Sequence, residues 1–364
     1  MTNDMRILCI TVMRNEAPFI LEWLAYHKTI GVTDFLIYSN DCDDGTDLLL
    51  DRLQDLGIVA HLDNPQSGKK TVQWKALNRA RNHDLTKQAD WILVSDVDEF
   101  LTIHVGDGKI ADLFAARPDA AGFVIDWRMF GSSGIMAYED KCIIEQFTRA
   151  APESMLWPWR AVQFKSLYRN DPRYSKLGVH RPKVRDGLPM WEGWVHGSGV
   201  PVARLPCTIF PTMRPRYTLA QLNHYALGSV GNFLVKAARG KPNHSDDPIN
   251  LSYWIDRNFN VTDDTRILRH LNTVRAQVSE WRKDPKIDQL HEQGVDWRKK
   301  KARSLLDQSD PFYTMTRIQQ MGATVTLDFQ EQRRLLDQLF RVRHLIALEK
   351  SITNREKPNG VHTE

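Results

Sequence analysis

The chain of 364 residues has few cysteines, little net charge and no long apolar run. Its four cysteines are widely separated and form no C-x-x-C pair, so neither a zinc knuckle nor a disulfide framework is indicated, and a reducing compartment fits best. The 49 Lys and Arg exceed the 45 Asp and Glu by only 4. Because so small an excess requires no polyanionic partner, we expect no nucleic acid among its ligands.

The sequence also has no obvious membrane or export segment. Residues 7–12 form a short apolar run, but no basic stretch precedes a long apolar one, and no run reaches the roughly 18 apolar residues of a membrane span. We therefore predict a cytoplasmic protein, with peripheral contact to the inner membrane face as the alternative to be tested.

What the chain does contain is typical of a folded protein. Hydrophobic residues make up 42% and charged residues 26% of it, which matches globular usage, and the length exceeds that of a usual single core. After residue 240 the composition shifts to helical patterns, notably over 264–282 and 327–350. We place a boundary there, between a domain of residues 1–240 and a mainly helical region of residues 241–364.

Strand and helix patterns alternate over the first hundred residues. Short runs rich in β-branched and aromatic residues alternate with longer runs of helical spacing. The expected strands are 6–12, 33–39, 58–62 and 91–95, and the expected helices are 18–30, 47–56 and 71–88, with Thr46 as the cap of the second helix. This order predicts an α/β fold with a mostly parallel sheet flanked by helices.

Polar clusters follow three of these strands. They are Arg14-Asn15-Glu16, the segment 40–47, and Asp96-Val97-Asp98-Glu99. Because ligands of such sheets bind beyond the carboxyl ends of the strands, we expect the three clusters to converge on one site.

The Asp96-Val97-Asp98-Glu99 segment is the strongest single signal. Three carboxylates at the mouth of a sheet repel one another unless a cation or hydrogen-bond donors offset them. In a straight strand Asp96 and Asp98 face the same side, so one divalent ion could satisfy both. An isolated D-x-D has a plainer interpretation as a helix cap or loop in roughly one case in three, so its context decides.

That context carries a resemblance. Read in order, Arg14-Asn15-Glu16, the segment 40–47, the helix segment 75–82 and Asp96 to Phe100 resemble the family 2 type of glycosyltransferase, which has the nucleotide-diphospho-sugar (GT-A) fold. Within it the chain is similar to a bacterial branch with a D-x-D-E-F motif. The resemblance is clear over residues 6–135 and looser through 176–182 and 222–240. It implies a nucleotide-sugar half, 1–135, and an acceptor half, 136–240.

The resemblance also implies roles for single residues. It assigns donor binding to residues of the polar clusters and of the third helix: Arg14, Glu16, Asp41, Asp43, Asn78, Arg79 and Asp96. Either Asp41 or Asp43 would accept a hydrogen bond from an N–H of the nucleobase. The choice stays open, because segment 40–47 departs from the usual D-D-G-S-x-D. Asp96 would bind ribose or a metal-bound water, and Asp98 would coordinate Mn²⁺ or Mg²⁺ at the diphosphate, where a cation offsets the charge of the leaving group.

His224 is the candidate for a further metal ligand, because similar enzymes supply a late histidine from a loop over the diphosphate. A structural histidine is an equally good interpretation, and His180 stands no better. For the catalytic base that takes the acceptor proton, Glu192 between Trp191 and Trp194 is the first candidate and Asp126 the second.

The stretch 327–350 predicts an amphipathic helix with a basic face. Packing onto the catalytic domain or a second copy of the chain is the plainer interpretation. Peripheral binding to an anionic membrane that carries a lipid-linked acceptor is the alternative.

Together these observations predict a metal-dependent, inverting glycosyltransferase of polysaccharide biosynthesis, with a UDP-sugar as donor and a glycan or lipid-linked acceptor. A D-x-D phosphohydrolase is disfavoured, because such enzymes place the nucleophilic Asp at the end of the first strand, where this chain has Arg14-Asn15-Glu16. A non-catalytic saccharide-binding or adaptor protein of the same fold is the second alternative.

Overall fold

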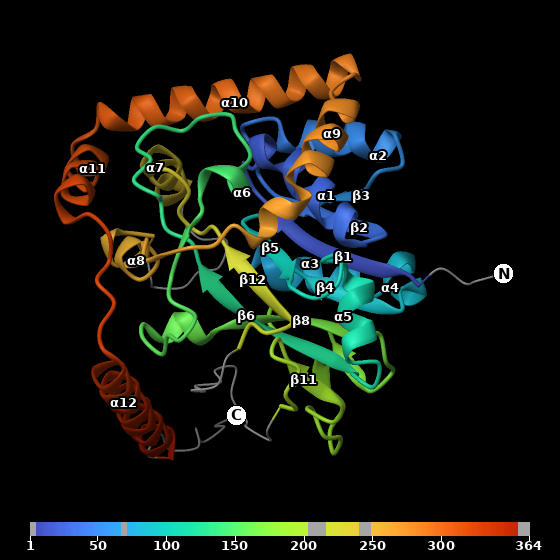
Figure 1. The fold of residues 1–364 in the computed structure, drawn as a ribbon, viewed down its shortest axis with the longest axis vertical. Helices are drawn as coiled ribbons and strands as arrows, with labels where there is room; N and C mark the ends of the chain where they lie inside the picture. Colours follow the sequence, from blue (N-terminus) through green and yellow to red (C-terminus); the bar gives the residue numbers. More distant parts are fainter. Residues whose placement is uncertain (1–4, 67–70, 203–215, 240–248, 356–364) are drawn as a thin grey trace, which may run out of the picture.

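The computed structural model describes residues 5–66, 71–202, 216–239 and 249–355 (Figure 1). Strands and helices alternate at first and helices alone make up the last part of the chain, as Figure 1 shows from blue to red. The predicted α/β class, with a mostly parallel sheet flanked by helices and a helical C-terminal region, is confirmed.

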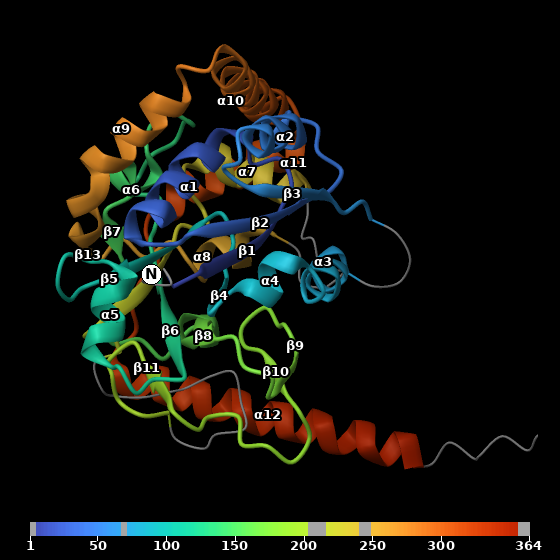
Figure 2. The same cartoon turned by 90° about the vertical axis from the view of Figure 1, so that its right-hand side faces the viewer.

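The first half of the sheet is parallel, in the order β3-β2-β1-β4. Its strands are β1 (Ile7–Met13), β2 (Asp34–Ser39), β3 (Ala60–Asp63) and β4 (Trp91–Val94). The helices between them are α1 (Ala17–Ile30), α2 (Thr46–Asp55), α3 (Val72–Ala80) and α4 (Asp84–Gln88). In Figure 2, α1 and α2 lie on one face of these strands and α3 and α4 on the other.

The second half of the sheet mixes directions, in the order β8-β6-β12-β5. β8 (Phe164–Arg169) is antiparallel to both β4 and β6 (Gly122–Met129), whereas β12 (Ala220–His224) is parallel to β6 and antiparallel to β5 (Glu99–Ile103). β11 (Trp194–His196) also pairs with β6. Two small sheets join β7 (Arg149–Ala150) to β13 (Thr262–Asp263) and β9 (Tyr174–Lys176) to β10 (Lys183–Val184).

The remaining helices follow β5 in the chain and continue to the end of the described residues. They are α5 (Ile110–Ala116), α6 (Ile143–Gln146), the 3-10 helix η1 (Trp159–Val162), α7 (Val230–Arg239), α8 (Leu251–Ile255), the 3-10 helix η2 (Arg266–His270), α9 (Leu271–Trp281), α10 (Pro285–Leu306), α11 (Ser309–Met321) and α12 (Phe329–Arg355).

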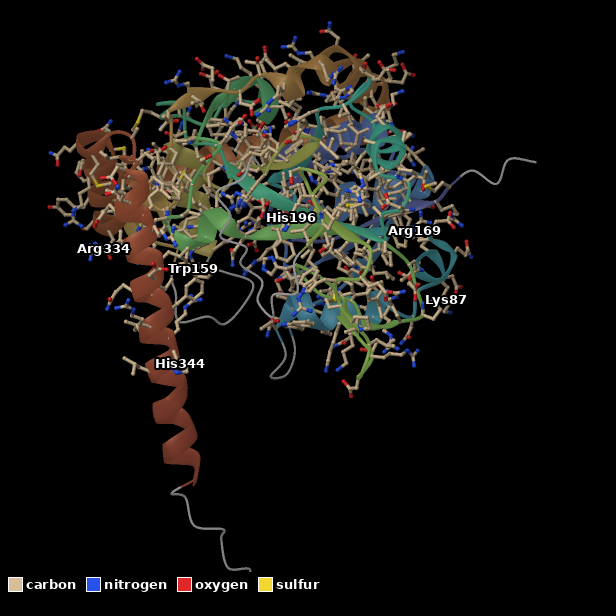
Figure 3. The ribbon with its side chains drawn as sticks, turned by 60° about the horizontal axis from the view of Figure 1, so that its bottom comes forward. Lys87, Trp159, Arg169, His196, Arg334 and His344 are labelled. Atoms are coloured by element: carbon tan, nitrogen blue, oxygen red, sulfur yellow. The ribbon has the colours of Figure 1, made fainter. Side chains whose placement is uncertain are left out.

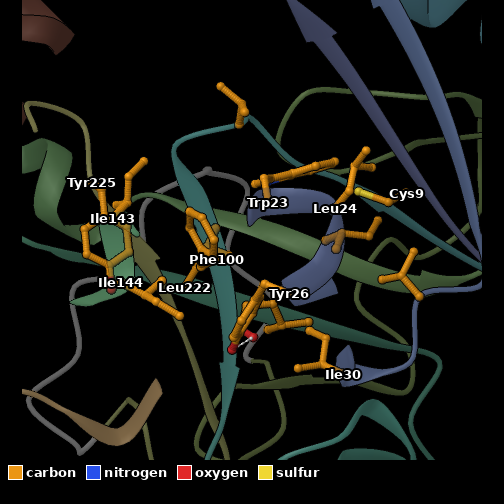
Figure 4. Close-up of a cluster of buried hydrophobic side chains, with 14 of the residues drawn as sticks. Cys9, Trp23, Leu24, Tyr26, Ile30, Phe100, Ile143, Ile144, Leu222 and Tyr225 are labelled. Carbon is orange, nitrogen blue, oxygen red and sulfur yellow. Dashed lines mark hydrogen bonds between the residues drawn. The ribbon is translucent and has the colours of Figure 1, made fainter. Parts of the chain in front are cut away.

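The core has one apolar layer on each face of the sheet. β1 is buried on both faces: Cys9 belongs to the cluster under α1, while Leu8 and Ile10 belong to the cluster under α3. Figure 4 shows the first cluster, where the α1 aromatic residues also carry hydrogen bonds. The Tyr26 hydroxyl donates to the Leu101 carbonyl at 2.9 Å and the Trp23 indole N–H donates to the Glu99 carbonyl at 3.1 Å. These two bonds fix α1 to β5, directly behind the D-x-D segment.

Two local predictions were wrong. The predicted helix over 71–88 is interrupted, because His83 accepts from the Leu85 N–H and begins a separate helix, α4. Thr46 is not the cap of α2, which is Gly45 in the left-handed region at φ +84°. The Thr46 hydroxyl instead accepts from the Glu16 N–H at 2.8 Å and donates to Asp44 at 2.7 Å, so it ties the loop after β1 to the loop after β2.

The C-terminal helices pack on the first half of the chain. α10 lies against α1, where Gly294 approaches Ala17 so closely that a Cβ added to the glycine would lie 2.5 Å from the Ala17 Cβ. Asp284, the cap of α10, pairs with Arg52 of α2 at 2.6 Å. The predicted boundary after residue 240 falls outside the described residues, and the division of residues 1–240 at 135 stays a prediction.

The last helix, α12, extends away from the sheet, with Arg334 near its start and His344 farther out (Figure 3). Near its first turns Leu336 packs against Leu156, and Arg343 lies over the Trp159 ring at 4.4 Å. Within the described ranges, every helix is too short or too polar to cross a membrane.

Replacing Gly294 by valine tests the packing of α10 on α1. We expect Gly294→Val to lower the free energy of unfolding by about 1–3 kcal/mol, because the new side chain collides with Ala17. Urea denaturation measures it. The control is Gln293→Val on the exposed face of the same helix, expected within about 0.5 kcal/mol of the unchanged protein. Equal stability of the two variants would contradict this contact.

Candidate active site

A cleft of about 1370 Å³, partly open to solvent, lies at the carboxyl ends of β1 and β4. One wall comes from residues after these strands, including Arg14 and Asp96 to Asp98. Trp127 of β6, His224 of β12 and residues of α7 and α8 also line the cleft. The expected convergence of the polar clusters is therefore observed for the first and third clusters, while the second contributes Asn40 to the lining.

Asp98 stands between a lysine and a histidine. Its Oδ2 accepts from Nζ of Lys236 at 2.6 Å, and its Oδ1 lies 3.8 Å from Nε2 of His224. Burial by itself would raise the pKa of Asp98, but Lys236, His224 and Arg239 together outweigh that effect and hold the pKa well below its usual range. Asp98 is therefore ionised, and its Oδ1 faces an imidazole.

His224 is buried against the face of Trp127, with the two ring centroids 4.3 Å apart. Burial lowers the pKa of His224 to about 3 despite the nearby Asp98 carboxylate. At neutral pH the imidazole is thus uncharged and has a lone pair to offer a ligand.

Asp96 and Glu99 share one buried lysine. Nζ of Lys165, on β8, lies 3.0 Å from Asp96 and 3.4 Å from Glu99. Glu99 is fully buried and also accepts from the Asp96 N–H at 2.8 Å. Burial opposes the charge of Lys165, but the two carboxylates outweigh it and raise the pKa of the lysine above its usual value. Glu99 therefore holds the main chain of the D-x-D turn, and Lys165 holds the Asp96 carboxylate.

Glu16 is held by two arginines that come from distant parts of the chain. Arg239 of α7 contacts it at 2.5 Å and also donates to the Arg14 carbonyl, while Arg298 of α10 lies 3.7 Å away and donates to the Asn15 carbonyl. Through Arg298 the C-terminal helices help to shape the end of β1.

The cleft has an excess of positive charge. Six cationic side chains line it against three carboxylates: Arg14, Arg160, Lys165, Lys236, Arg239 and Arg257, against Glu16, Asp96 and Asp98. One of the six, Arg160, also lies 3.6 Å from Asp256, outside the lining. Such a surplus, partly shielded from water, favours a multiply charged anionic ligand.

Of the predicted site residues, the structure brings five into this cleft: Arg14, Glu16, Asp96, Asp98 and His224. Four others are exposed and absent from its lining: Asp41, Asp43, Asn78 and Arg79. The Asp41 carbonyl accepts from Arg14, and Arg79 lies over the Tyr38 ring at 5.2 Å. From α3, Gln73 lines the cleft instead, because it lies on the buried face of that helix.

The structure does not place either predicted base in the cleft. Glu192 is mostly exposed, lies 3.6 Å from Arg173 and lines a separate hollow. Asp126 is fully buried, with Arg216 at 4.0 Å, and burial raises its pKa to about 7. Trp127, the next residue of β6, lines the cleft instead of Asp126, because successive side chains of a strand face opposite sides.

The cleft also contains residues for which no role was predicted from the sequence. The position of Lys165 beside Asp96 could not be predicted from the sequence, because the two residues are 69 positions apart and Lys165 lies in a stretch without clear periodicity. Lys236 and Arg239 stood within a recognised motif, but only the fold shows that they face the carboxylates. Trp127 carried no signal beyond its place in a strand.

Comparison with known proteins gives a family. Residues 5–187, half of the chain, match the model of glycosyltransferase family 92. Family 92 proteins of Oryza sativa subsp. japonica and Arabidopsis thaliana are 27% and 31% identical over 191 and 200 residues. These alignments cover 50% of this chain but only 30% and 32% of the relatives, so the chain spans less than a third of their length.

Among solved structures, S. aureus TarS in complex with UDP is similar with a TM-score of 0.30 and 16% identity, over 46% of this chain and 47% of that one. Its complex with UDP-GlcNAc gives 0.28 and 18%, over 46% of each chain. At these TM-scores the similarity supports no conclusion about this chain.

The match identifies family 92, and the resemblance to family 2 and to its D-x-D-E-F branch is not confirmed by it. The motifs of the first strand and of the D-x-D turn lie within the matched residues, as does Lys165. The chain belongs to glycosyltransferase family 92.

Proposed function

We propose that this chain transfers a sugar from a nucleotide-diphosphate donor, a UDP-sugar, to a glycan or lipid-linked acceptor, with inversion and with the help of Mn²⁺ or Mg²⁺. Family membership supports the reaction type. The observation that carries the proposal is the cationic cleft built around Asp98 and His224 at the carboxyl edge of the sheet.

The cationic wall supports a diphosphate ligand. Lys236 and Arg239 lie on one face of α7, three residues apart, and Arg257 follows α8 on the same side of the cleft. These side chains would contact the phosphate oxygens and stabilise the negative charge that develops when the sugar leaves. We propose that Arg14 and Glu16 at the end of β1, together with Asp96, bind the nucleoside of the donor. Asp41 or Asp43, which lie outside the cleft lining, are the candidates to contact its nucleobase.

The donor set fits a divalent cation held jointly with the nucleotide. Ligands of Mg²⁺ lie at about 2.1 Å, so two of them on one ion are at most about 4.2 Å apart, and the 3.8 Å between Asp98 and His224 falls within that limit. No group of three or more His, Cys, Asp or Glu suited to a metal occurs in the described part of the chain. Diphosphate oxygens and water would have to supply the remaining ligands.

The bound ion would offset the charge of the leaving diphosphate. The protein's own contribution is to keep Asp98 ionised through Lys236, and to keep His224 neutral through burial against Trp127. Asp96 is held by Lys165 and Glu99, which supports a contact to ribose or to a metal-bound water.

We also propose that the protein works in the cytoplasm, in polysaccharide biosynthesis, and that α12 joins it to a membrane surface or to a second copy of the chain. Exposed Val342 and Leu345 on this helix, next to Arg341 and Arg343, support a contact beyond the chain itself.

Replacing His224 tests the joint metal site. In Mn²⁺ we expect UDP to bind His224→Ala about 10-fold more weakly than the unchanged protein, a loss of about 1.4 kcal/mol. In chelator we expect UDP to bind both proteins weakly and with the same affinity. Calorimetric titration of both proteins, with and without Mn²⁺, measures this. A purely structural histidine would give a lower melting temperature and an unchanged Mn²⁺ dependence of UDP affinity, and that result would remove His224 from the site.

Replacing Asp98 tests the chemistry. We expect Asp98→Asn to lose transfer by a factor of at least about 100, because the ionised ligand of the metal is gone, while the circular dichroism spectrum stays unchanged. The matched control is Asp119→Asn, an exposed carboxylate paired with Arg117 outside the cleft lining, and it should keep full activity. Loss of secondary structure in Asp98→Asn, or transfer within a few-fold of normal, would contradict the assignment.

A further inference from the structure

An inverting transfer needs a group that takes the proton of the acceptor hydroxyl, and the cleft restricts the choice. Each carboxylate of its described lining is paired with a cation: Glu16 with Arg239, Asp96 with Lys165, and Asp98 with Lys236. In each pair an ammonium or guanidinium group already lies 2.5 to 3.0 Å from a carboxylate oxygen. Among the proton acceptors of that lining, two histidines remain, and His224 faces Asp98 at the proposed metal site.

We propose that His180 is the catalytic base, with its Nε2 taking the proton from the acceptor hydroxyl as that oxygen attacks the sugar. This inference rests on the proposed function, because it concerns the same cleft and the same transfer.

The tautomer of His180 is fixed by the fold. The residue lies in the loop between β9 and β10, and its Nδ1 lies 2.7 Å from the main-chain carbonyl of Phe164. Because a carbonyl only accepts, Nδ1 must carry the proton, and the lone pair is therefore on Nε2. The Ser166 hydroxyl donates to the His180 carbonyl, so strand β8 holds the residue at two points.

Both histidines pack near the ring of Trp127, whose centroid lies 4.3 Å from that of His224 and 5.9 Å from that of His180. Inversion requires the nucleophile and the leaving group to lie on opposite sides of the anomeric carbon. The proposal therefore assigns the diphosphate to His224 and Asp98, and the acceptor hydroxyl to His180.

The surroundings keep the imidazole neutral. Burial and the Lys165 ammonium together lower the pKa of His180 to about 4, against the opposing effects of the Phe164 carbonyl and of Asp96. At neutral pH the base is therefore present in its proton-accepting form. Once protonated, it lies near the Lys165 cation and releases the proton readily to water.

The step balances without another reactant. The acceptor oxygen forms a bond to the anomeric carbon, the bond from that carbon to the phosphate oxygen breaks, and the diphosphate leaves with the electron pair. The hydroxyl proton passes to Nε2 of His180 and then to solvent.

His180→Asn tests this proposal, because an asparagine amide can still donate to the Phe164 carbonyl but cannot act as a base. The matched control is His104→Asn. Nδ1 of His104 also contacts a main-chain carbonyl, that of Tyr217, and burial lowers the pKa of this histidine to about 4 as well, but it does not line the cleft. Two quantities are measured on each protein: the Kd of UDP with Mn²⁺, and the kcat for UDP-glucose, UDP-galactose and UDP-GlcNAc with p-nitrophenyl glycosides or water as acceptor.

We expect His180→Asn to bind UDP within about 2-fold of the unchanged protein while kcat falls at least about 100-fold, the usual contribution of a general base. His104→Asn should keep both values. A kcat within about 5-fold of normal, or a loss of UDP affinity that accounts for the lost rate, would overturn the role of His180. An unchanged protein that neither binds nor consumes these donors would overturn the proposed function itself.

Discussion

The cleft depends on the neutralisation of carboxylates that one edge of the sheet brings together. Glu16 follows β1, and Asp96, Asp98 and Glu99 follow β4, so their charges repel one another. Arg239 and Lys236 of α7, Lys165 of β8 and Arg298 of α10 each contact one or two of them at 2.5 to 3.7 Å. These four cations come from β8, α7 and α10, which are far apart in the sequence. All three elements are therefore needed, together with the strands that bring the carboxylates, to make the site.

The same charges link stability to function. A set of cations that only offset the carboxylates would leave the cleft neutral, but its lining has twice as many cationic side chains as carboxylates. In the proposed function this excess would bind an anionic ligand, and the ionised Asp98 beside a neutral His224 would give a divalent ion two ligands of the kind that it prefers. A nucleotide diphosphate with its metal would satisfy both features at once.

The parallel half of the fold and the D-x-D turn could be predicted from the sequence, because both are local. Apolar runs such as 91–94 predict buried strands, and the polar residues that follow them predict the carboxyl edge of the sheet. The rest depended on distant contacts. Lys165 approaches Asp96 because β8 enters the sheet antiparallel to β4. Glu192 was predicted as a base because Trp191 and Trp194 flank it, and the sequence does not show that it contacts Arg173 and lines a separate hollow. Likewise, no local signal distinguishes Trp127, which faces the cleft, from Asp126, which is buried.

We propose that this cleft binds a metal ion and a nucleotide diphosphate together, with Asp98 and His224 as the side-chain ligands of the metal. Electron paramagnetic resonance of Mn²⁺, titrated with the unchanged protein in the presence and absence of UDP, tests it most directly. We predict that the free Mn²⁺ signal persists with protein alone, because two side chains hold the ion weakly, and falls well below that of an Mn²⁺–UDP mixture when protein and UDP are both present. Tight Mn²⁺ binding without UDP, or no further loss of signal when protein joins Mn²⁺ and UDP, would contradict the account.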